Sequence, residues 1–388
     1  MLKFNNKVLK VNDKWLNVEE GPSPSLPPYT IRLLYKDGAT PSFSKGTGVQ
    51  LSQSPNVWDL TYDNSDWSNI LEYHEDLLEV LGANTTGVTN MQSTFGDCTA
   101  LMSIILFDTS NVTKMGCMFF ECSSLSSVPL FDTSNVTEMW GMFSRCAALT
   151  TVPLFNTSSV TNMYGMFRDC PSLTTVPLFD TSKVTYMYDM FNNCPSLTTV
   201  PLFDTSNVTD MGDMFRWCSS LTSIPLFDTS NVYHMGYMFD GCTSLTTVPL
   251  FNTSNVNNME GMFNNCPSLT TVPLFDTSNV GDMNHLFKGC ISLTTVPLFD
   301  TSNNTSMWNM FDGCTSLINI PLFDTSKVTD MNSAFNNCIN VQSGALALYQ
   351  QASSQANPPT EHNQAFRNCG TNTTTGQAEL AQIPSDWK

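Results

Sequence analysis

The fold is decided by a segment that recurs along the whole chain. From Cys194 to Cys218 this segment reads CPSLTTVPLFDTSNVTDMGDMFRWC. Its phenylalanine at position 203 belongs to a series that runs from Phe107 to Phe323 in steps of 24 residues without a slip. An inserted residue would push the side chains of one copy out of register with both neighbours. Each 24-residue copy is therefore expected to form one coil of a stacked solenoid.

Within one coil, the apolar residues are predicted to point inward from short parallel strands and from one helical or 3₁₀ turn. In this copy they are Leu197, Val200 and Leu202, then Val208 and Met211, then Met214, Phe215 and Cys218. About eight such side chains contribute roughly 1.5–3 kcal/mol each when fully buried, whereas ordering each residue of the coil costs ~1–2 kcal/mol. A single coil is thus expected to be unfolded, and neighbouring coils must stack to stabilise one another.

The chain is predicted to contain five segments. They are a β-rich N-terminal anchoring module (1–20), a proline-rich linker (21–28), an N-terminal cap (29–76), the solenoid of 24-residue coils (77–340), and a distorted last coil with a C-terminal cap (341–388). The last coil carries seven inserted residues and a predicted helix at 344–353. Caps are needed because an open coil would expose its apolar interior and its backbone edge.

Composition limits the classes of function. The net charge of −18 and the pI near 4.3 disfavour binding to nucleic acid. The apolar runs are too short to span a membrane, and the start of the chain lacks the apolar stretch of a secretion signal, so synthesis and folding in a cytoplasm are expected. The 13 cysteines are predicted to be reduced, buried and packed as small hydrophobic groups. Without a CxxC spacing, we expect no zinc site, and no cofactor is predicted.

The repeated string closely resembles the bacterial surface-protein repeat family, which belongs to the BspA-like branch of the leucine-rich repeats. The resemblance covers residues 77–340. It implies a right-handed solenoid, similar to leucine-rich repeats, of about 11–12 coils and a role in binding rather than catalysis. Members of that family are often secreted or lipid-anchored proteins of the bacterial surface.

The flanking segments resemble other proteins. Residues 1–15 and 56–84 are similar to fibre or appendage proteins of phages that infect gut Bacteroidetes. That resemblance implies a virion appendage, made in the cytoplasm of the host bacterium, whose N-terminal module attaches to other virion structural proteins. The anchoring candidates are Leu2, Phe4, Val8, Leu9, Val11, Trp15 and Leu16.

In this interpretation the solenoid binds, or is displayed toward, a host-surface glycan or protein, and a homo-oligomer is possible. The main alternative is a BspA-like adhesin on a bacterial cell surface. A polysaccharide depolymerase built on a solenoid is a third alternative. No enzyme activity is predicted, because the four histidines are scattered and no Ser/His/Asp set converges by spacing.

A row of aspartates follows the repeated phenylalanine. It comprises Asp108, Asp132, Asp180, Asp204, Asp228, Asp276, Asp300 and Asp324. A calcium row could neutralise these carboxylates. However, Asn156 and Asn252 replace two of them, and no second carboxylate recurs beside each one. We therefore expect these side chains to cap local turns.

The variable positions near the fixed methionine are the best candidates for a binding face. Most coils carry small or polar residues there, whereas several carry large aromatic residues: Trp140, Tyr164, Tyr186, Tyr188, Trp217, Tyr233, Tyr237 and Trp308. Exposed aromatic residues concentrated on one face are typical of interaction hot spots and of sugar-stacking surfaces. The alternative interpretation is drift on an unselected surface, or aromatic rings that only pack on neighbouring coils.

Overall fold

The computed structural model describes residues 3–4, 7–8, 10–11, 14–15 and 26–388. Near the N-terminus, strand β1 (Lys3–Phe4) pairs antiparallel with β2 (Lys7–Val8), and β3 (Lys10–Val11) pairs antiparallel with β4 (Lys14–Trp15). Among the anchoring candidates, Phe4, Val8, Val11 and Trp15 belong to these strands. Leu2, Leu9 and Leu16 lie outside the described residues.

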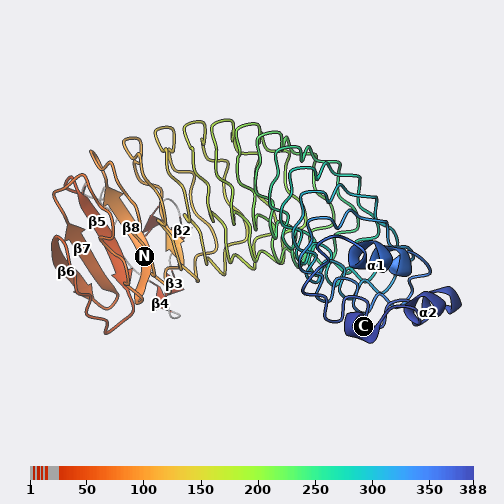
Figure 1. Ribbon diagram of the computed structural model, residues 1–388. Helices are drawn as coiled ribbons and strands as arrows, with labels where there is room; N and C mark the ends of the chain where they lie inside the picture. Colours follow the sequence, from red (N-terminus) through yellow and green to blue (C-terminus); the bar gives the residue numbers. More distant parts are fainter. Residues whose placement is uncertain (1–2, 5–6, 9, 12–13, 16–25) are drawn as a thin grey trace.

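A five-stranded sheet closes the N-terminal end of the array (Figure 1). Its strands are β5 (Thr30–Tyr35), β6 (Thr47–Gln53), β7 (Asn56–Thr61), β8 (Leu77–Asn84) and β9 (Ser103–Ile104), in the order β6-β7-β5-β8-β9. Pairing is antiparallel up to β8, and then β8 pairs parallel with β9. Strand β8 therefore joins the antiparallel cap to the parallel stacking of the coils.

The coils stack in parallel through a continuous series of backbone contacts, which confirms the predicted solenoid. Single parallel bridges join Tyr186 to Asp210 and Asp210 to His234, and similar bridges recur along the array. Backbone N–H groups of Met211 and Phe215 donate to carbonyl groups of the next coil at 3.1 and 3.0 Å. The expected short strands are thus reduced, in most coils, to one bridged residue each.

The segment from the fixed methionine to the cysteine forms a series of separate hydrogen-bonded turns instead of the expected helical or 3₁₀ turn. The N–H of Met214 donates to the carbonyl of Met211 at 3.3 Å, within its own coil. Two residues of this segment, Asp213 and Trp217, have left-handed backbone conformations with φ of 54° and 58°. Such residues interrupt a right-handed helix, so hydrogen bonds alternate between the same coil and the next one.

Aromatic and sulfur-containing side chains fill the interior. The ring centroids of Phe215 and Phe239 lie 5.9 Å apart and the rings are nearly parallel. The Sγ of Cys218 donates to the carbonyl of Phe191 at 3.1 Å, and the same contact recurs at the other ladder cysteines. All 13 cysteines are unpaired; 12 are buried and Cys117 is half-buried. A cysteine thus fills apolar space and also satisfies a buried carbonyl.

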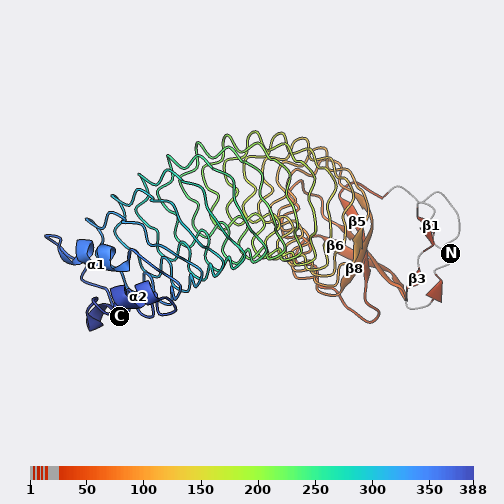
Figure 2. The ribbon, with the colours of Figure 1, turned by 90° about the vertical axis from the view of Figure 1, so that its right-hand side faces the viewer.

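The array is bowed, as Figures 1 and 2 show. Ring centroids are 5.7 Å apart between Phe191 and Phe215, but 6.5 Å apart between Phe203 and Phe227. Equivalent atoms of a curved stack are farther apart on its outer side. The array therefore bends toward the methionine-to-cysteine segments. We define the concave face as the residues from two before the fixed methionine to the cysteine of each coil, for example 209–218.

One inward prediction is wrong. Leu202 is 60% exposed. The N–H of Phe203 donates to the carbonyl of Pro201 at 3.0 Å, which closes a three-residue turn with Leu202 at its apex. This turn directs Phe203 into the core and Leu202 outward. The equivalent leucines of the other coils are exposed in the same way: Leu106, Leu130, Leu154, Leu178, Leu226, Leu250, Leu274, Leu298 and Leu322.

The coil pattern begins earlier than the predicted start at residue 77. Asp66 forms a parallel bridge with Asn90, and the N–H of Trp67 donates to the carbonyl of Asn90 at 2.8 Å. Trp67 is buried where later coils place methionine. A degenerate half-coil within the cap therefore supports the first complete coil.

The C-terminal end is closed by helices α1 (Ala345–Ser353) and α2 (Thr374–Leu380) and by the 3₁₀ helix η1 (Ser385–Trp387). Helix α1 confirms the predicted helix, whereas α2 was not predicted. Phe366 stacks on Phe335 with centroids 5.6 Å apart, and its N–H donates to the carbonyl of Trp387 at 2.8 Å. Across the described residues, no helix has both the length and the apolar character needed to cross a membrane.

Candidate binding face

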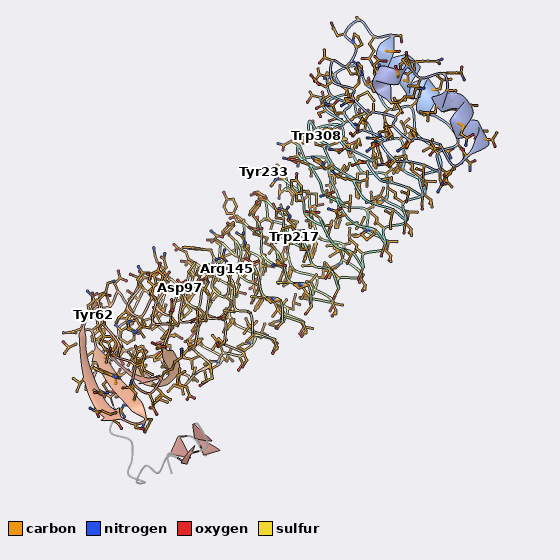
Figure 3. All side chains as sticks on the ribbon, turned by 90° about the horizontal axis from the view of Figure 1, so that it is seen from below. Tyr62, Asp97, Arg145, Trp217, Tyr233 and Trp308 are labelled. Atoms are coloured by element: carbon orange, nitrogen blue, oxygen red, sulfur yellow. The ribbon has the colours of Figure 1, made fainter. Side chains whose placement is uncertain are left out.

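The predicted aromatic residues all lie on the concave face. Five of them are between 39% and 48% exposed, namely Tyr164, Tyr186, Trp217, Tyr233 and Trp308. The other three, Trp140, Tyr188 and Tyr237, are partly buried. In Figure 3 the labelled side chains Trp217, Tyr233 and Trp308 follow the long axis of the array. The structure thus brings the predicted residues onto one face, although their rings are used differently.

Three of these rings pack over glycines of adjacent coils. A Cβ added at Gly116 would lie 2.7 Å from the indole ring of Trp140. An added Cβ would lie 2.3 Å from the Trp217 ring at Gly241, and 2.3 Å from the Tyr237 ring at Gly261. Each glycine occupies the position equivalent to that of the ring, 24 residues away. These three rings therefore serve inter-coil packing, as the alternative interpretation expected.

Two of the residues with packed rings also have a strained backbone. Trp217 and Tyr237 have φ of 58° and 55°, a left-handed region that is costly for large side chains. The following coil places Gly241 and Gly261 at the equivalent positions, where glycine adopts this conformation without a steric cost.

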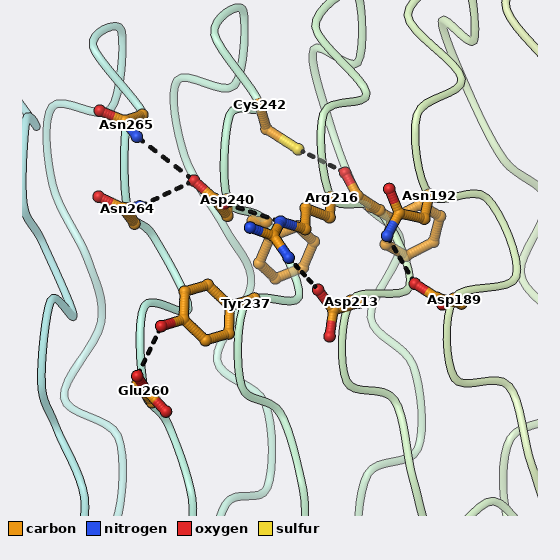
Figure 4. Close-up of polar contacts among 12 residues, drawn as sticks. Asp189, Asn192, Asp213, Arg216, Tyr237, Asp240, Cys242, Glu260, Asn264 and Asn265 are labelled. Atoms are coloured by element: carbon orange, nitrogen blue, oxygen red, sulfur yellow. Dashed lines mark hydrogen bonds and ion pairs between the residues drawn. The ribbon is translucent and has the colours of Figure 1, made fainter. Parts of the chain in front are cut away.

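Arg216 lies between these two aromatic side chains, and Figure 4 shows its contacts with Asp213 and Asp240. Its guanidinium carbon is 4.6 Å from the ring centroid of Trp217 and 5.0 Å from that of Tyr237. Its Nη1 donates to Asp213 Oδ1 at 3.0 Å, and its Nε donates to Asp240 Oδ2 at 2.9 Å. Burial raises the pKa of the Asp240 carboxyl, while Arg216 opposes this shift. Within this cluster, the carboxylates of Asp213 and Asp240 therefore balance the positive charge of Arg216.

Further polar contacts extend this cluster to the next coil. The hydroxyl of Tyr237 donates to Glu260 Oε1 at 2.6 Å, and Asn264 Nδ2 donates to Asp240 Oδ1 at 3.0 Å. The pKa of the Tyr237 hydroxyl is raised, mainly by partial burial and secondly by the hydrogen bond to Glu260. Tyr237 is thus fixed by both its ring and its hydroxyl.

A second group of rings forms a row along the array. Tyr164 and Tyr188 stack with centroids 5.7 Å apart and an interplanar angle of 6°. Tyr188 also stacks against His234 at 6.1 Å, across Gly212. His234 Nδ1 lies 2.9 Å from Asp210 Oδ1, and this hydrogen bond raises the pKa of the imidazole. Because these rings turn their faces toward one another, their exposed edges are what a ligand would meet.

Tyr186 and Tyr233 are the exceptions. They are 47% and 44% exposed, and neither ring belongs to a stacked pair among residues 26–388. Asp210 bridges Tyr186 on one side and His234, the residue after Tyr233, on the other. Partial burial and the nearby Asp210 charge raise the pKa of the Tyr233 hydroxyl. These two rings therefore have faces that remain available to a ligand.

Trp308 lies farther along the same face. Its ring meets His285 edge to face, with centroids 4.5 Å apart. Its backbone N–H donates to Asn284 Oδ1 at 3.1 Å. Trp308 therefore contacts His285 and Asn284 of the preceding coil and does not belong to the row of tyrosines in earlier coils.

The aspartate row caps turns, as predicted. Asp204 Oδ1 accepts hydrogen bonds from the backbone N–H and the hydroxyl of Ser206, at 3.0 and 2.7 Å. The same contacts lower the pKa of Asp180 and of Asp228. Within residues 26–388, no group of three or more His, Cys, Asp or Glu residues is arranged to hold a metal ion.

Two contacts of the candidate face were missed in the sequence, although a signal was present. Arg216 and Asp240 are 24 residues apart, and so are Asp210 and His234. Comparing residues at this step would have paired opposite charges in adjacent coils. The contact between Arg216 and the two rings depends on side-chain direction, which the spacing does not specify.

These observations define a repeat solenoid with an aromatic concave face. The chain belongs to the family described as "Mycoplasma protein of unknown function, DUF285", whose model matches residues 67–175, 120–200, 163–271 and 244–349. These matches together span 67–349, well over half of the 388 residues. The first match begins at Trp67, in the degenerate half-coil. No match was found among the curated proteins.

Solved structures of similar proteins include leucine-rich-repeat proteins of bacteria. One is a leucine rich cell surface protein from Faecalibacterium prausnitzii A2-165, at 24% identity, covering 73% of this chain and 78% of that chain with a TM-score of 0.46. Another is a leucine-rich repeat protein from Eubacterium ventriosum ATCC 27560, at 16% identity, covering 77% and 92% with a TM-score of 0.42. A third is a leucine rich repeat protein from Treponema pallidum, at 15% identity, covering 60% of this chain and 86% of that chain with a TM-score of 0.26.

Proposed function

We propose that this protein is a non-catalytic binding solenoid, displayed at a bacterial cell surface, whose concave face binds an external polymer. The observation that carries this proposal is the pair Tyr186 and Tyr233, whose rings are nearly half exposed and unstacked. Tyrosines of this kind supply a large contact area with little loss of side-chain freedom, and they are enriched at interaction hot spots.

The surrounding structure suits a binding role. The coil stack holds the two tyrosines on a rigid scaffold, because a backbone hydrogen bond joins each of them to an adjacent coil. The N–H of Tyr233 donates to the carbonyl of Thr209 at 3.0 Å, and the N–H of Met163 donates to the carbonyl of Tyr186 at 3.1 Å. A rigid, curved array offers an extended surface for a long ligand.

Whether a bacterial cell or a virion carries the array is a separate part of the proposal. The family description names a bacterial protein and gives no location, and on that ground we propose a bacterial cell rather than a virion as the carrier. A virion appendage would use the same concave face and would differ in what residues 1–20 attach to. Antibody labelling of intact, unlysed cells and of purified phage particles distinguishes the two carriers.

The binding role is tested with the double variant Tyr186→Ala/Tyr233→Ala. Purified protein is measured for attachment to host cells and to an array of surface glycans. We expect attachment to fall at least tenfold, equivalent to about 1.4 kcal/mol or more, while the circular dichroism spectrum stays unchanged.

The matched control is Thr198→Ala/Thr222→Ala, two exposed threonines that lie outside the concave face. This control should retain attachment. If the threonine variant loses attachment and the tyrosine variant keeps it, the ligand binds outside the concave face and the proposal is wrong.

A further inference from the structure

The chemical class of the ligand can be inferred from Asp210, and this inference rests on the proposed binding role. The bridges to Tyr186 and His234 place Asp210 in the coil between the two free tyrosines. Its Oδ1 accepts hydrogen bonds from the Gly212 N–H and from His234 Nδ1, both at 2.9 Å. Its Oδ2 accepts no hydrogen bond from the described residues. One carboxylate oxygen is therefore fixed by the fold and the other is left for a ligand.

Most basic groups beside this site are paired with carboxylates. Arg216 is paired with Asp213 and Asp240. His234, whose Nδ1 lies 2.9 Å from Asp210 Oδ1, carries a positive charge only when it is protonated. Lys183 belongs to no ion pair among the described residues, but it lies in the turn beside Asp180. An acidic ligand would thus meet more carboxylates than free cations, in a chain whose net charge is −18.

Arg168, on the coil before Tyr186, follows the same pattern. Its Nη1 lies 3.3 Å from Asp189 Oδ2, and its Nε lies 3.5 Å from Asp169 Oδ2. In contrast, Glu260 and Asp282 on the following coils belong to no ion pair among the described residues. The local excess of negative charge therefore favours a ligand that carries positive charge.

We propose that Tyr186, Asp210 and Tyr233 bind the ammonium group of an amino-sugar oligomer. An ammonium ion is attracted to the face of a tyrosine ring and forms a charge-assisted hydrogen bond with a carboxylate. The C–H face of a pyranose ring covers the apolar surface of the same aromatic ring. The tyrosines are two coils apart, or ~10 Å at the usual strand spacing, so the ligand extends beyond one sugar unit.

Four tetramers test this proposal by isothermal titration calorimetry: glucosamine, N-acetylglucosamine, galacturonic acid and lysine. Glucosamine tetramer should bind at least tenfold tighter than the uncharged N-acetylglucosamine tetramer, and galacturonic acid tetramer should not bind. Added salt should weaken the glucosamine complex.

Asp210→Asn isolates the charge, because asparagine retains an acceptor oxygen for the Gly212 N–H. This variant should bind glucosamine tetramer about five- to tenfold more weakly and should leave N-acetylglucosamine binding unchanged. Asp228→Asn, in the turn-capping row on another part of the coil, is the matched control and should change neither.

The outcomes separate this inference from the proposed function. Equal binding of both glucosamine forms, unaffected by Asp210→Asn, overturns the charge inference but leaves the binding role intact. Binding of the lysine tetramer without either sugar overturns the amino-sugar class in favour of a basic peptide. Attachment of the protein to host cells with no binding of any tetramer also overturns the amino-sugar class. Absence of attachment to cells and glycans alike overturns the proposed function itself.

Discussion

Asn304 is the core position at which a single substitution should stabilise the protein most. It is 0% exposed, and neither its Oδ1 nor its Nδ2 has a hydrogen-bond partner. The equivalent residue of the preceding coil, Val280, and of the following coil, Val328, is a buried valine. The series of parallel bridges is also interrupted here, because Asp282 is bridged to Asn258 but, among the described residues, not to Ser306. Asn304 therefore marks a weak joint between two blocks of coils.

Asn304→Val should raise the free energy of local unfolding by about 2–4 kcal/mol. An unsatisfied buried amide costs ~1–3 kcal/mol, and valine adds apolar burial at a site of similar volume. Native-state hydrogen exchange followed by mass spectrometry measures this gain in peptides from residues 305–340. Exchange should slow by roughly 30- to 700-fold, since 1.4 kcal/mol is a factor of ten.

Val280→Asn is the matched control in the preceding coil, and it should accelerate exchange by a similar factor. If Asn304→Val changes the exchange rate by less than threefold, or increases it, the buried amide does not destabilise the protein. If Val280→Asn is harmless, this core tolerates buried amides and the reasoning fails.

Three further predictions follow from burial and charge. Leu202→Ala should change the free energy of unfolding by less than about 0.5 kcal/mol, whereas Leu197→Ala, fully buried, should cost about 2–5 kcal/mol; similar urea midpoints for both would contradict the assigned directions. In native protein, the half-buried Cys117, whose pKa burial raises to about 11, should be the first thiol to react, and a buried ladder cysteine reacting first would show that the coils open. Burial and the neighbouring Glu121 raise the pKa of Asp97 from 3.8 to about 6, so stability is lost as pH rises through this range. Asp97→Asn should therefore raise the melting temperature at pH 7.5 and leave it unchanged at pH 4, and equal shifts at both pH values would rule out this cause.

The period of 24 residues was sufficient to predict the coil stack and most of its core. Phe215 and Cys218 are fully buried, as the register required. The direction of Leu202 could not be obtained in the same way, because alternation of side chains assumes an extended backbone. The turn between Pro201 and Phe203 breaks that assumption.

The candidate face was only partly predictable. Variation beside the fixed methionine identified the aromatic positions, but it did not show which rings remain free. Trp217 and Tyr237 occupy space above Gly241 and Gly261, so their role depends on the residue in the adjacent coil. Tyr186 has no such glycine partner and is free. Comparing residues 24 positions apart recovers these pairings, whereas the backbone strain at Trp217 and Tyr237 requires the structure.

The most direct test of the central claim is a crystal structure of the protein with a bound fragment of the polymer to which it attaches. We predict that the fragment contacts the rings of Tyr186 and Tyr233 and runs along the concave face, with Asp210 between them. A fragment bound to the exposed leucine row around Leu202, or to the N-terminal sheet, would contradict the assignment of the concave face as the binding surface.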